Sequence, residues 1–479
     1  MAKAPKAEAR EFFLSAPTQG WDTETPVEEL PQTRTGGPFD NFIPTGTSVS
    51  IRKGVSEHAT PDIDDLLLET GDRLLAETSD RLLLESAAEV FPVETLMPYV
   101  SGVTAALFAA AGASIYNVTS AGGFGSASLA SRTSARFSFV NFTTSGGSFL
   151  WICNGADAPQ HWNGSAWAAP SLSLTTFNAT DIKYVFAHKE RLFVIFKDSL
   201  TFGYLATQAI AGTVSNFPLG AVFSMGGELV AGATLSRDGG SGTDDFAVFL
   251  TSEGEVAVYA GTNPGSAADW ALVGVYYVGE PIGDRPFVDL GPDLGVITAQ
   301  GLISVLAVMA GEELGDANVF ARIATPLQTA ITAGRGFSGW EGLLIPSEGL
   351  LLMNAPVTAT TARQFIRHTA SKGPGRFTGW NFETFEIFSG DCYAGTSDGR
   401  VMLCFDGYDD DGADITAAGA TAWSMLGAPG VKVLSEIRPA VTVPTLAALR
   451  AVGRADFRDT PALGAWPMAA TVNALVWNT

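Results

Sequence analysis

A hairpin pattern recurs along most of this chain. Each instance consists of an apolar strand, a short turn and a second apolar strand, and successive instances begin 42 to 57 residues apart. A period of about 40–50 residues built from hairpins is typical of β-propeller blades, which need neighbours in a closed ring to bury their faces. The seven hairpins occupy residues 107–116, 149–167, 191–204, 248–259, 294–306, 343–353 and 392–405.

This spacing predicts an all-β fold, a β-propeller of six or seven blades over residues 100–415. The composition agrees, because 53 Gly and 25 Pro among 479 residues supply many turn formers and argue against a helix bundle. Hydrophobic residues make up 46% of the chain, which is enough for a large core. A β-sandwich or two stacked β-domains is the alternative, but neither requires so regular a spacing.

An N-terminal arm precedes the propeller. Residues 1–60 show no clear period and are punctuated by proline, so we expect an extended segment with one short strand at 48–54. The aromatic rings of Trp21, Phe39 and Phe42 must be buried somewhere, and we expect a neighbouring chain to bury them. Deleting the arm should then weaken assembly and leave the propeller folded.

A spacer at residues 61–99 contains three tandem octads, LLLETGDR, LLAETSDR and LLLESAAE, over residues 66–89. Eight residues correspond to about 2.2 helical turns, so a helix would not align the leucines in one stripe. Short strands joined at residues 70–72 and 78–80 are the favoured interpretation. The spacer is then either a projecting β-hairpin that contacts a neighbouring subunit or a local duplication without a partner.

A peripheral C-terminal β segment is predicted at residues 416–479. Strand-like runs lie at 431–433 and 441–443, and no turn or cap closes the segment, which ends in Trp477-Asn-Thr479. We therefore expect an incomplete β unit beside the propeller.

The charge balance disfavours tight binding of nucleic acid. Lys and Arg number 28 against 50 Asp and Glu, which gives a net charge of −22. Phosphate binding needs clustered basic residues, whereas Arg52-Lys53 and Lys189 to Arg191 are isolated. No window of 18 apolar residues predicts a membrane span, and the N-terminal residues contain no long apolar run typical of a secretory signal.

The sequence predicts no catalytic, cofactor or metal site, and hence no enzyme. Motifs for a Walker P-loop, a GxSxG elbow and an HExxH zinc site are all missing from the sequence. The glycine-rich run 232–242 is followed by an apolar strand rather than a helix, so we interpret it as an inter-strand loop. Candidate carboxylates for glycoside hydrolysis are expected in turns, not on strands that face a pocket: Glu253, Glu255, Glu348 and Asp398.

Cysteine and histidine give no metal or redox pattern. Three cysteines are too few for a disulfide scaffold. We expect Cys392 and Cys404, on the two strands of one hairpin, to be buried apolar residues rather than a redox pair. The four histidines stand at no metal-ligand spacing: His58, His161, His188 and His368.

An acidic run follows the last hairpin. Asp406, Asp409, Asp411, Gly412 and Asp414 do not fit the register of an EF-hand loop. We interpret the run as a solvated acidic turn, with binding of a hard cation by the Asp406–Asp414 loop as the alternative.

Several segments carry a resemblance to a known family. Asp40-Asn-Phe-Ile-Pro44, followed by Val49-Ser-Ile-Arg-Lys-Gly54 and His58-Ala59, resembles the N-terminal "DNFFP…LRKG…HA" signature of tail proteins encoded by bacteriophages and prophages. The resemblance is diffuse and covers about residues 12–445. Its central part is similar over Val185–Phe193, Phe217–Gly220, Asp244-Asp245 and Glu253–Tyr259, and the octads look like spacers of phage structural proteins.

Such proteins are similar to the tail nozzle or hub proteins (tail tubular protein B type) of short-tailed phages. The resemblance implies a virion structural protein of the viral tail, made in the host cytoplasm, that bears a β-propeller. It further implies a homo-hexamer below a head–tail adaptor ring, tail fibre or tail-tip proteins as neighbours, and genomic DNA that passes through the lumen during DNA ejection. Chains of this family continue past the position of Trp477 into another β segment, so the resemblance does not define the far end of a nozzle.

The physical chemistry of the chain suits that role. A ring of identical subunits needs heterologous contacts whose rotation closes, and an acidic lumen would let DNA slide without adhering. The alternative function is a propeller-type module at the tail tip that binds a receptor or carbohydrate. The two differ in assembly, because a nozzle should form a sixfold ring and a binding module should be monomeric or trimeric.

Overall fold

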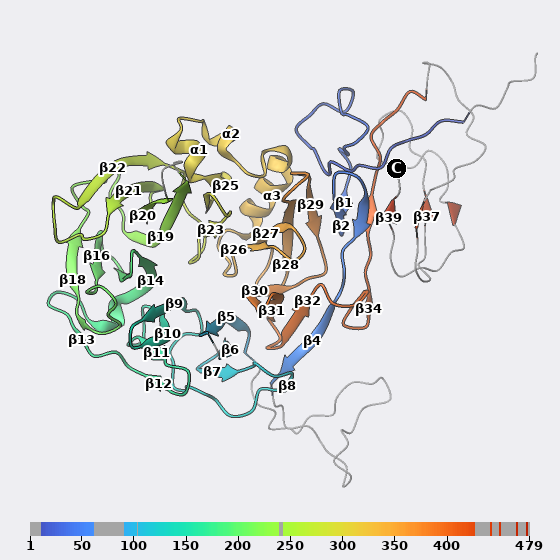
Figure 1. Ribbon diagram of the computed structural model, residues 1–479. Helices are drawn as coiled ribbons and strands as arrows, with labels where there is room; N and C mark the ends of the chain where they lie inside the picture. Colours follow the sequence, from blue (N-terminus) through green and yellow to red (C-terminus); the bar gives the residue numbers. More distant parts are fainter. Residues whose placement is uncertain are drawn as a thin grey trace, which may run out of the picture.

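A ring of β-sheets forms most of the molecule in this computed structural model, with the N-terminal arm along one side (Figure 1). The structure describes residues 11–61, 91–102, 104–238 and 243–426, together with four two-residue strands nearer the C-terminus. The octads at 66–89 lie outside the described residues, as does the predicted strand at 431–433.

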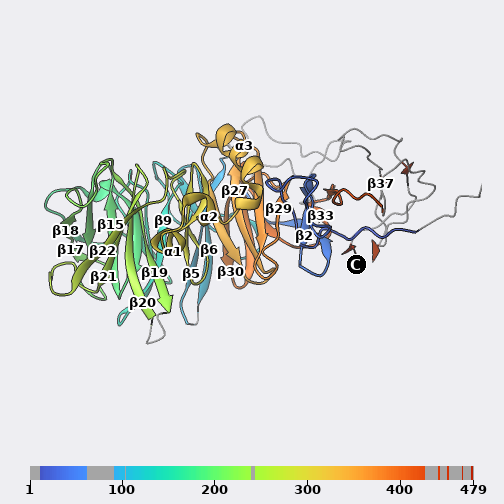
Figure 2. The ribbon, with the colours of Figure 1, turned by 90° about the horizontal axis from the view of Figure 1, so that it is seen from above.

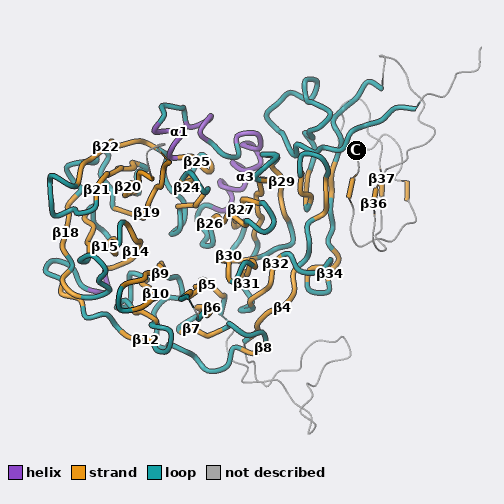
Figure 3. The backbone as a smooth tube through the Cα atoms, in the orientation of Figure 1, coloured by secondary structure: helices purple, strands orange, loops and turns teal. Residues whose placement is uncertain are grey.

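Seven sheets follow one another around the ring, and each begins with its innermost strand. Every innermost strand contacts the innermost strand of the next sheet, and the seventh contacts the first, so the ring is closed. The predicted β-propeller is therefore confirmed. Figure 2 shows the sheets standing side by side, and Figure 3 shows how few helices interrupt them. The innermost strands are β5 (Val93–Val100), β9 (Ser138–Thr144), β14 (Ile182–His188), β19 (Leu229–Asp238), β23 (Phe287–Asp289), β26 (Glu341–Ile345) and β30 (Phe382–Phe388).

The remaining strands of each sheet lie progressively farther from the centre. The first four sheets add β6 (Ala105–Ala111) and β7 (Ser114–Asn117); β10 (Gly147–Cys153), β11 (Gln160–Trp162) and β12 (Trp167–Ala168); β15 (Arg191–Phe196), β16 (Thr201–Tyr204) and β18 (Ser215–Pro218); and β20 (Thr243–Thr251), β21 (Glu255–Gly261) and β22 (Trp270–Tyr277). The last three add β24 (Leu294–Thr298) and β25 (Gly301–Ser304); β27 (Leu350–Pro356), β28 (Ala362–His368) and β29 (Pro374–Phe377); and β31 (Asp391–Thr396) and β32 (Val401–Cys404). Short strands β8 (Gly122–Gly123), β13 (Leu172–Ser173) and β17 (Gly212–Thr213) pair outside this pattern.

All seven predicted hairpins are present as antiparallel pairs, from β6–β7 to β31–β32. Gly254 shows why a glycine in the sequence indicates the turn of such a hairpin. Gly254 joins β20 to β21 at φ +85, and a Cβ there would lie 2.4 Å from the carbonyl group of Gly279. Only glycine meets both demands without strain.

The arm completes the ring. Strand β4 (Val55–Thr60) pairs antiparallel with β32, so a strand from the start of the chain becomes the fourth strand of the last sheet. This pairing joins the two ends of the propeller through backbone hydrogen bonds. The arm is therefore a part of the propeller as well as an extension from it.

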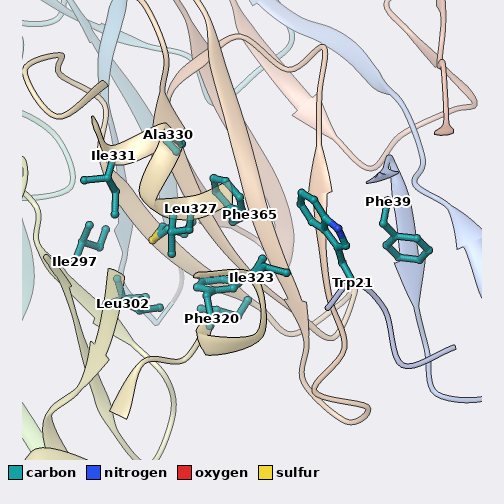
Figure 4. Close-up of a cluster of buried hydrophobic side chains, with 14 of the residues drawn as sticks. Trp21, Phe39, Ile297, Leu302, Phe320, Ile323, Leu327, Ala330, Ile331 and Phe365 are labelled. Atoms are coloured by element: carbon teal, nitrogen blue, oxygen red, sulfur yellow. The ribbon is translucent and has the colours of Figure 1, made fainter. Parts of the chain in front are cut away.

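The rest of the arm packs on the sixth sheet. Strand β1 (Phe39–Asp40) lies parallel to β29 and antiparallel to β35 (Ala418–Gly419). Trp21, Phe39 and Phe42 are buried in one cluster with residues of this same chain; Figure 4 labels Trp21 and Phe39 there. The expectation that a neighbouring chain buries these rings is wrong, because the sixth sheet already does so.

Two strands of the arm meet the C-terminal region. β2 (Phe42–Pro44) pairs with β3 (Val49–Ile51), which confirms the predicted strand near 48–54. β3 pairs in turn with β39 (Val476–Trp477), which also pairs with β36 (Val441–Thr442). A further pair joins β37 (Arg450–Ala451) to β38 (Trp466–Pro467).

Helices replace a fourth strand in the fifth sheet, a feature that the hairpin pattern did not predict. Ser304 ends β25, and its hydroxyl accepts a hydrogen bond from the Ala307 N–H, which caps the first helix. The third helix then turns Leu327 and Ile331 into the core. The helices are α1 (Val305–Met309), α2 (Leu314–Ala317), η2 (Ala321–Ile323) and α3 (Ala324–Gly334), and η1 (Ala179–Asp181) precedes β14.

Candidate functional site

Residues of the N-terminal signature, Asn41 and Arg52 among them, come together where the arm meets the sixth and seventh sheets. Asn41 adopts φ +61 between β1 and β2. Its side-chain oxygen accepts hydrogen bonds from Arg52 Nε at 3.0 Å and from the Thr378 N–H at 2.9 Å. Its side-chain nitrogen donates to the carbonyl of Thr416 at 2.8 Å. One asparagine thereby ties together the arm, the sixth sheet and the chain beyond the propeller.

Arg52 is the centre of this arrangement, and its side chain is completely buried. Its two terminal nitrogens form a bidentate ion pair with Asp410, at 2.7 and 2.5 Å. The guanidinium group also stacks 4.5 Å from the Trp380 ring, whose N–H donates to Asp410 at 3.0 Å. We call Asn41, Arg52, Trp380 and Asp410 the Arg52 cluster.

The acidic run after the last hairpin forms a small hairpin of its own, β33 (Asp409–Asp410) and β34 (Ala413–Asp414). Its interpretation as a solvated turn is wrong at Asp410, which is half-buried against Arg52. Asp411 pairs with Arg400 at 2.6 Å, and Asp406 accepts a hydrogen bond from the Ser56 hydroxyl at 2.7 Å. Asp406 therefore fastens the acidic run to the arm, and Asp411 fastens it to the seventh sheet.

A second cluster lies at the centre of the ring. Arg285, just before β23, donates to the Glu341 carboxylate at 2.7 Å and to the Thr384 hydroxyl at 3.0 Å. Its other terminal nitrogen donates to the Thr95 hydroxyl and to the carbonyls of Glu94 and Phe137. These partners lie at or near the starts of four other innermost strands, because Glu94 and Thr95 share β5. Because these strands run in the same direction through a propeller, Arg285 links five sheets at one end of the central axis.

Acidic side chains surround Arg285. Arg136 lies 3.5 Å from Glu94 and 3.7 Å from Asp284, so a second arginine neutralises part of that charge. Burial raises the pKa of Glu383, and it raises the pKa of Glu386 to about 8, with the negative charge of Glu341 adding to the shift. We call Arg285 and its partners the Arg285 cluster. Its hydrogen bonds hold five sheets together at one end of the central axis.

Stability should fall with pH because of Glu386. Its folded-state pKa of about 8 exceeds the ordinary 4.5, so the folded state holds a proton that the unfolded chain releases. The stability from that proton is complete below about pH 4.5 and is lost as the pH rises through 8. In Glu386→Gln we expect a smaller loss of unfolding free energy between pH 5 and 9, measured by denaturant titration. Parallel pH profiles for the two proteins would contradict this assignment.

The cysteines and histidines have structural surroundings. Cys392 and Cys404 are buried, which confirms that part of the prediction for them; the hydrogen bond with Cys404 and burial raise the pKa of Cys392. His188 is buried, with Nδ1 3.0 Å from the Thr234 hydroxyl, and His58 Nε2 lies 2.8 Å from the Val118 carbonyl. Among the described residues, no three His, Cys, Asp or Glu side chains gather as a metal site.

The structure also locates the glycine-rich run and three of the candidate carboxylates. Residues 232–238 belong to strand β19, so the interpretation of 232–242 as a loop is wrong over that part. The expectation that Glu255 lies in a turn is wrong, because it is the buried first residue of β21, where its carboxylate accepts hydrogen bonds from the backbone N–H groups of Ser224 and Met225. Glu348 pairs with Lys53 at 2.8 Å and Asp398 with Arg400 at 3.0 Å.

Comparison with known proteins finds only distant similarity to solved structures. No family model and no curated protein matches the chain. Among solved structures, BamB from Moraxella catarrhalis is similar at 11% identity and a TM-score of 0.38, over 74% of this chain and 97% of its own. Sqt1 from Saccharomyces cerevisiae is similar at 9% identity and a TM-score of 0.37, over 66% of this chain and 97% of its own. No helix in the described part of the chain is long and apolar enough to cross a membrane.

Proposed function

We propose that this protein is a virion structural protein, one subunit of a bacteriophage tail nozzle or hub. What supports the proposal is the place of the signature residues. Asn41 and Arg52, which belong to the N-terminal signature, hold the arm beside the sixth sheet: the Asn41 side-chain oxygen accepts from the Thr378 N–H, and Arg52 donates to the Thr378 carbonyl. Signature residues that stabilise the fold of the subunit are what we expect in a family of structural proteins.

The proposed partners follow from the resemblance. Six copies form a ring beneath a head–tail adaptor, tail fibre or tail-tip proteins attach to it, and genomic DNA passes through the lumen. The protein acts through its surfaces and not through catalysis, because the carboxylates of the Arg52 and Arg285 clusters are engaged in ion pairs and hydrogen bonds. The mass of the purified protein in solution, by analytical ultracentrifugation, tests this: a hexamer supports it and a monomer opposes it.

A tail-tip binding module is the second candidate, and the outer edge of the fourth sheet favours it. Strand β22 carries no charged residue, and it exposes Leu272, Val273 and Tyr277. An apolar edge strand of this kind is a common contact surface for another protein. A monomeric or trimeric protein that binds host cells would support this candidate over the nozzle.

The nozzle proposal predicts weak binding of duplex DNA at physiological salt. The net charge is −22. The lysines of the two isolated basic sites form ion pairs within the chain, Lys53 with Glu348 and Lys189 with Asp245. Tight binding would require several lysines or arginines that converge on phosphates. Fluorescence anisotropy with labelled duplex should show no saturation at physiological salt. Tight binding that weakens steeply with added salt would contradict a lumen through which DNA slides.

A further inference from the structure

Three parts of the chain meet beside the sixth sheet and bring arginines together. The backbone N–H of Thr23, in the arm, donates to the carbonyl of Arg322 in η2 at 2.9 Å. The N–H of Trp21 donates to the carbonyl of Pro374, the residue directly opposite Arg367 on the neighbouring strand. The arm, η2 and strand β28 therefore converge at one junction.

Arg367 and Arg322 both belong to this junction. Along β28, Arg367 follows Phe365 by two residues and so lies on the same face of the sheet. The Phe365 ring lies 6.5 Å from that of Phe320, and both pack with Ile323, the neighbour of Arg322 (Figure 4). The two half-buried arginines thus flank the same edge of this core.

The carboxylates at the junction are already engaged. Asp22 is buried; one oxygen accepts from the N–H groups of Glu24 and Thr25, and the other accepts from the Thr25 hydroxyl and from Arg34 at 2.9 Å. The Glu24 carboxylate accepts from the N–H of Thr325 at the start of α3. Neither carboxylate accepts a hydrogen bond from Arg322 or Arg367 in the described part of the chain.

Two positive charges are left without a partner. In the described part of the chain, the guanidinium groups of Arg322 and Arg367 form no ion pair and no hydrogen bond. Burial lowers the pKa of both; the charge of Arg34 lowers that of Arg322 further while the charge of Asp22 raises it, and the charge of Arg322 lowers that of Arg367. Half-buried charges of like sign are costly unless a counter-charge joins them. This arrangement is unusual in a protein whose net charge is −22.

We propose that Arg322 and Arg367 form a binding site for a phosphate-type oxyanion. Each planar guanidinium can donate two parallel hydrogen bonds to such a group, and two guanidinium groups match the charge of a phosphate dianion. Bound there, the anion would relieve the repulsion between the arginines and bridge η2 to the sixth sheet. The shared chemistry is the phosphate monoester dianion, whether free or attached to a small molecule.

Calorimetric titration of the full chain with inorganic phosphate, against chloride at equal ionic strength, tests the site. We expect saturable binding that falls by about tenfold or more in Arg322→Gln and in Arg367→Gln, the loss of one charge-assisted bidentate contact. Arg363→Gln is the matched control, because Arg363 is exposed on the same strand and the same face; its affinity should equal that of the unaltered protein. A parallel titration with glycerol phosphate shows whether the site also accepts an esterified group.

Thermal unfolding without phosphate gives an independent readout. If the arginines serve a ligand, Arg367→Gln should unfold at the same temperature as the unaltered protein or at a higher one, because a repulsion is removed. Phosphate should raise the unfolding temperature of the unaltered protein and of Arg363→Gln only. The proposal is overturned if phosphate acts no differently from chloride, or if Arg363→Gln weakens binding as much as Arg367→Gln does.

Discussion

Replacing Arg52 with methionine should lower the free energy of unfolding by about 3–5 kcal/mol, the cost of removing one partner of a buried ion pair. The Arg52 side chain is completely buried, and its removal leaves Asp410 facing the Trp380 ring without a counter-charge. The Asn41 oxygen also loses a hydrogen bond. Because this cluster joins the arm to two sheets, the loss should appear in cooperative unfolding of the propeller, measured by denaturant titration with circular dichroism.

Arg335→Met is the control for that experiment. Arg335 also pairs with a carboxylate, Glu280 at 3.0 Å, but the two side chains are 54% and 55% exposed. Exposed pairs contribute about 0–1 kcal/mol, so this variant should unfold almost as the unaltered protein does. Equal losses in the two variants would show that burial of the Arg52 cluster is not what gives it its importance.

Deleting residues 1–60 should prevent the propeller from folding. The deletion removes β4, the strand that closes the ring, and with it the buried Trp21, Phe39 and Phe42. Each lost core aromatic costs about 3–5 kcal/mol, so three exceed the typical total stability of about 5–15 kcal/mol when β4 is lost as well. We expect insoluble protein or a chain without cooperative thermal unfolding.

A shorter deletion serves as the comparison. Residues 11–14 are exposed and contribute no strand, so removal of residues 1–14 should leave the unfolding temperature unchanged. A soluble, cooperatively folded chain after deletion of residues 1–60 would show that the ring closes without β4. That result would restore the original expectation of an arm that serves assembly alone.

The sequence was most informative where a single residue determines a local conformation. Turn glycines such as Gly254, or the Lys-Asp-Ser turn at residues 197–199, mark the seven hairpins together with the apolar runs on both sides of each turn. Hairpins are local, so their signals lie within a dozen residues of one another. The propeller then followed from their spacing.

The arm and both charged clusters were beyond the reach of that reasoning. Burial of the arm's rings was expected, but prolines and aromatics do not say which surface accepts them. Asp410 lies 358 positions from Arg52, and Thr95 lies 190 positions from Arg285. Only closure of the ring brings such residues together, and an isolated arginine in the sequence does not indicate which distant residue it will contact. The hairpin pattern did not predict the helices after β25, because these short helices lie between two hairpins and leave the spacing of the hairpins regular.

Imaging the assembled protein by electron microscopy tests the central claim most directly. The account predicts a sixfold ring of propellers around an open lumen in which arginine and lysine do not predominate. The same ring should be found in phage particles between the adaptor and the end of the tail. A monomer or trimer on the outside of the tail, or a lumen lined mainly by arginine and lysine, would contradict it.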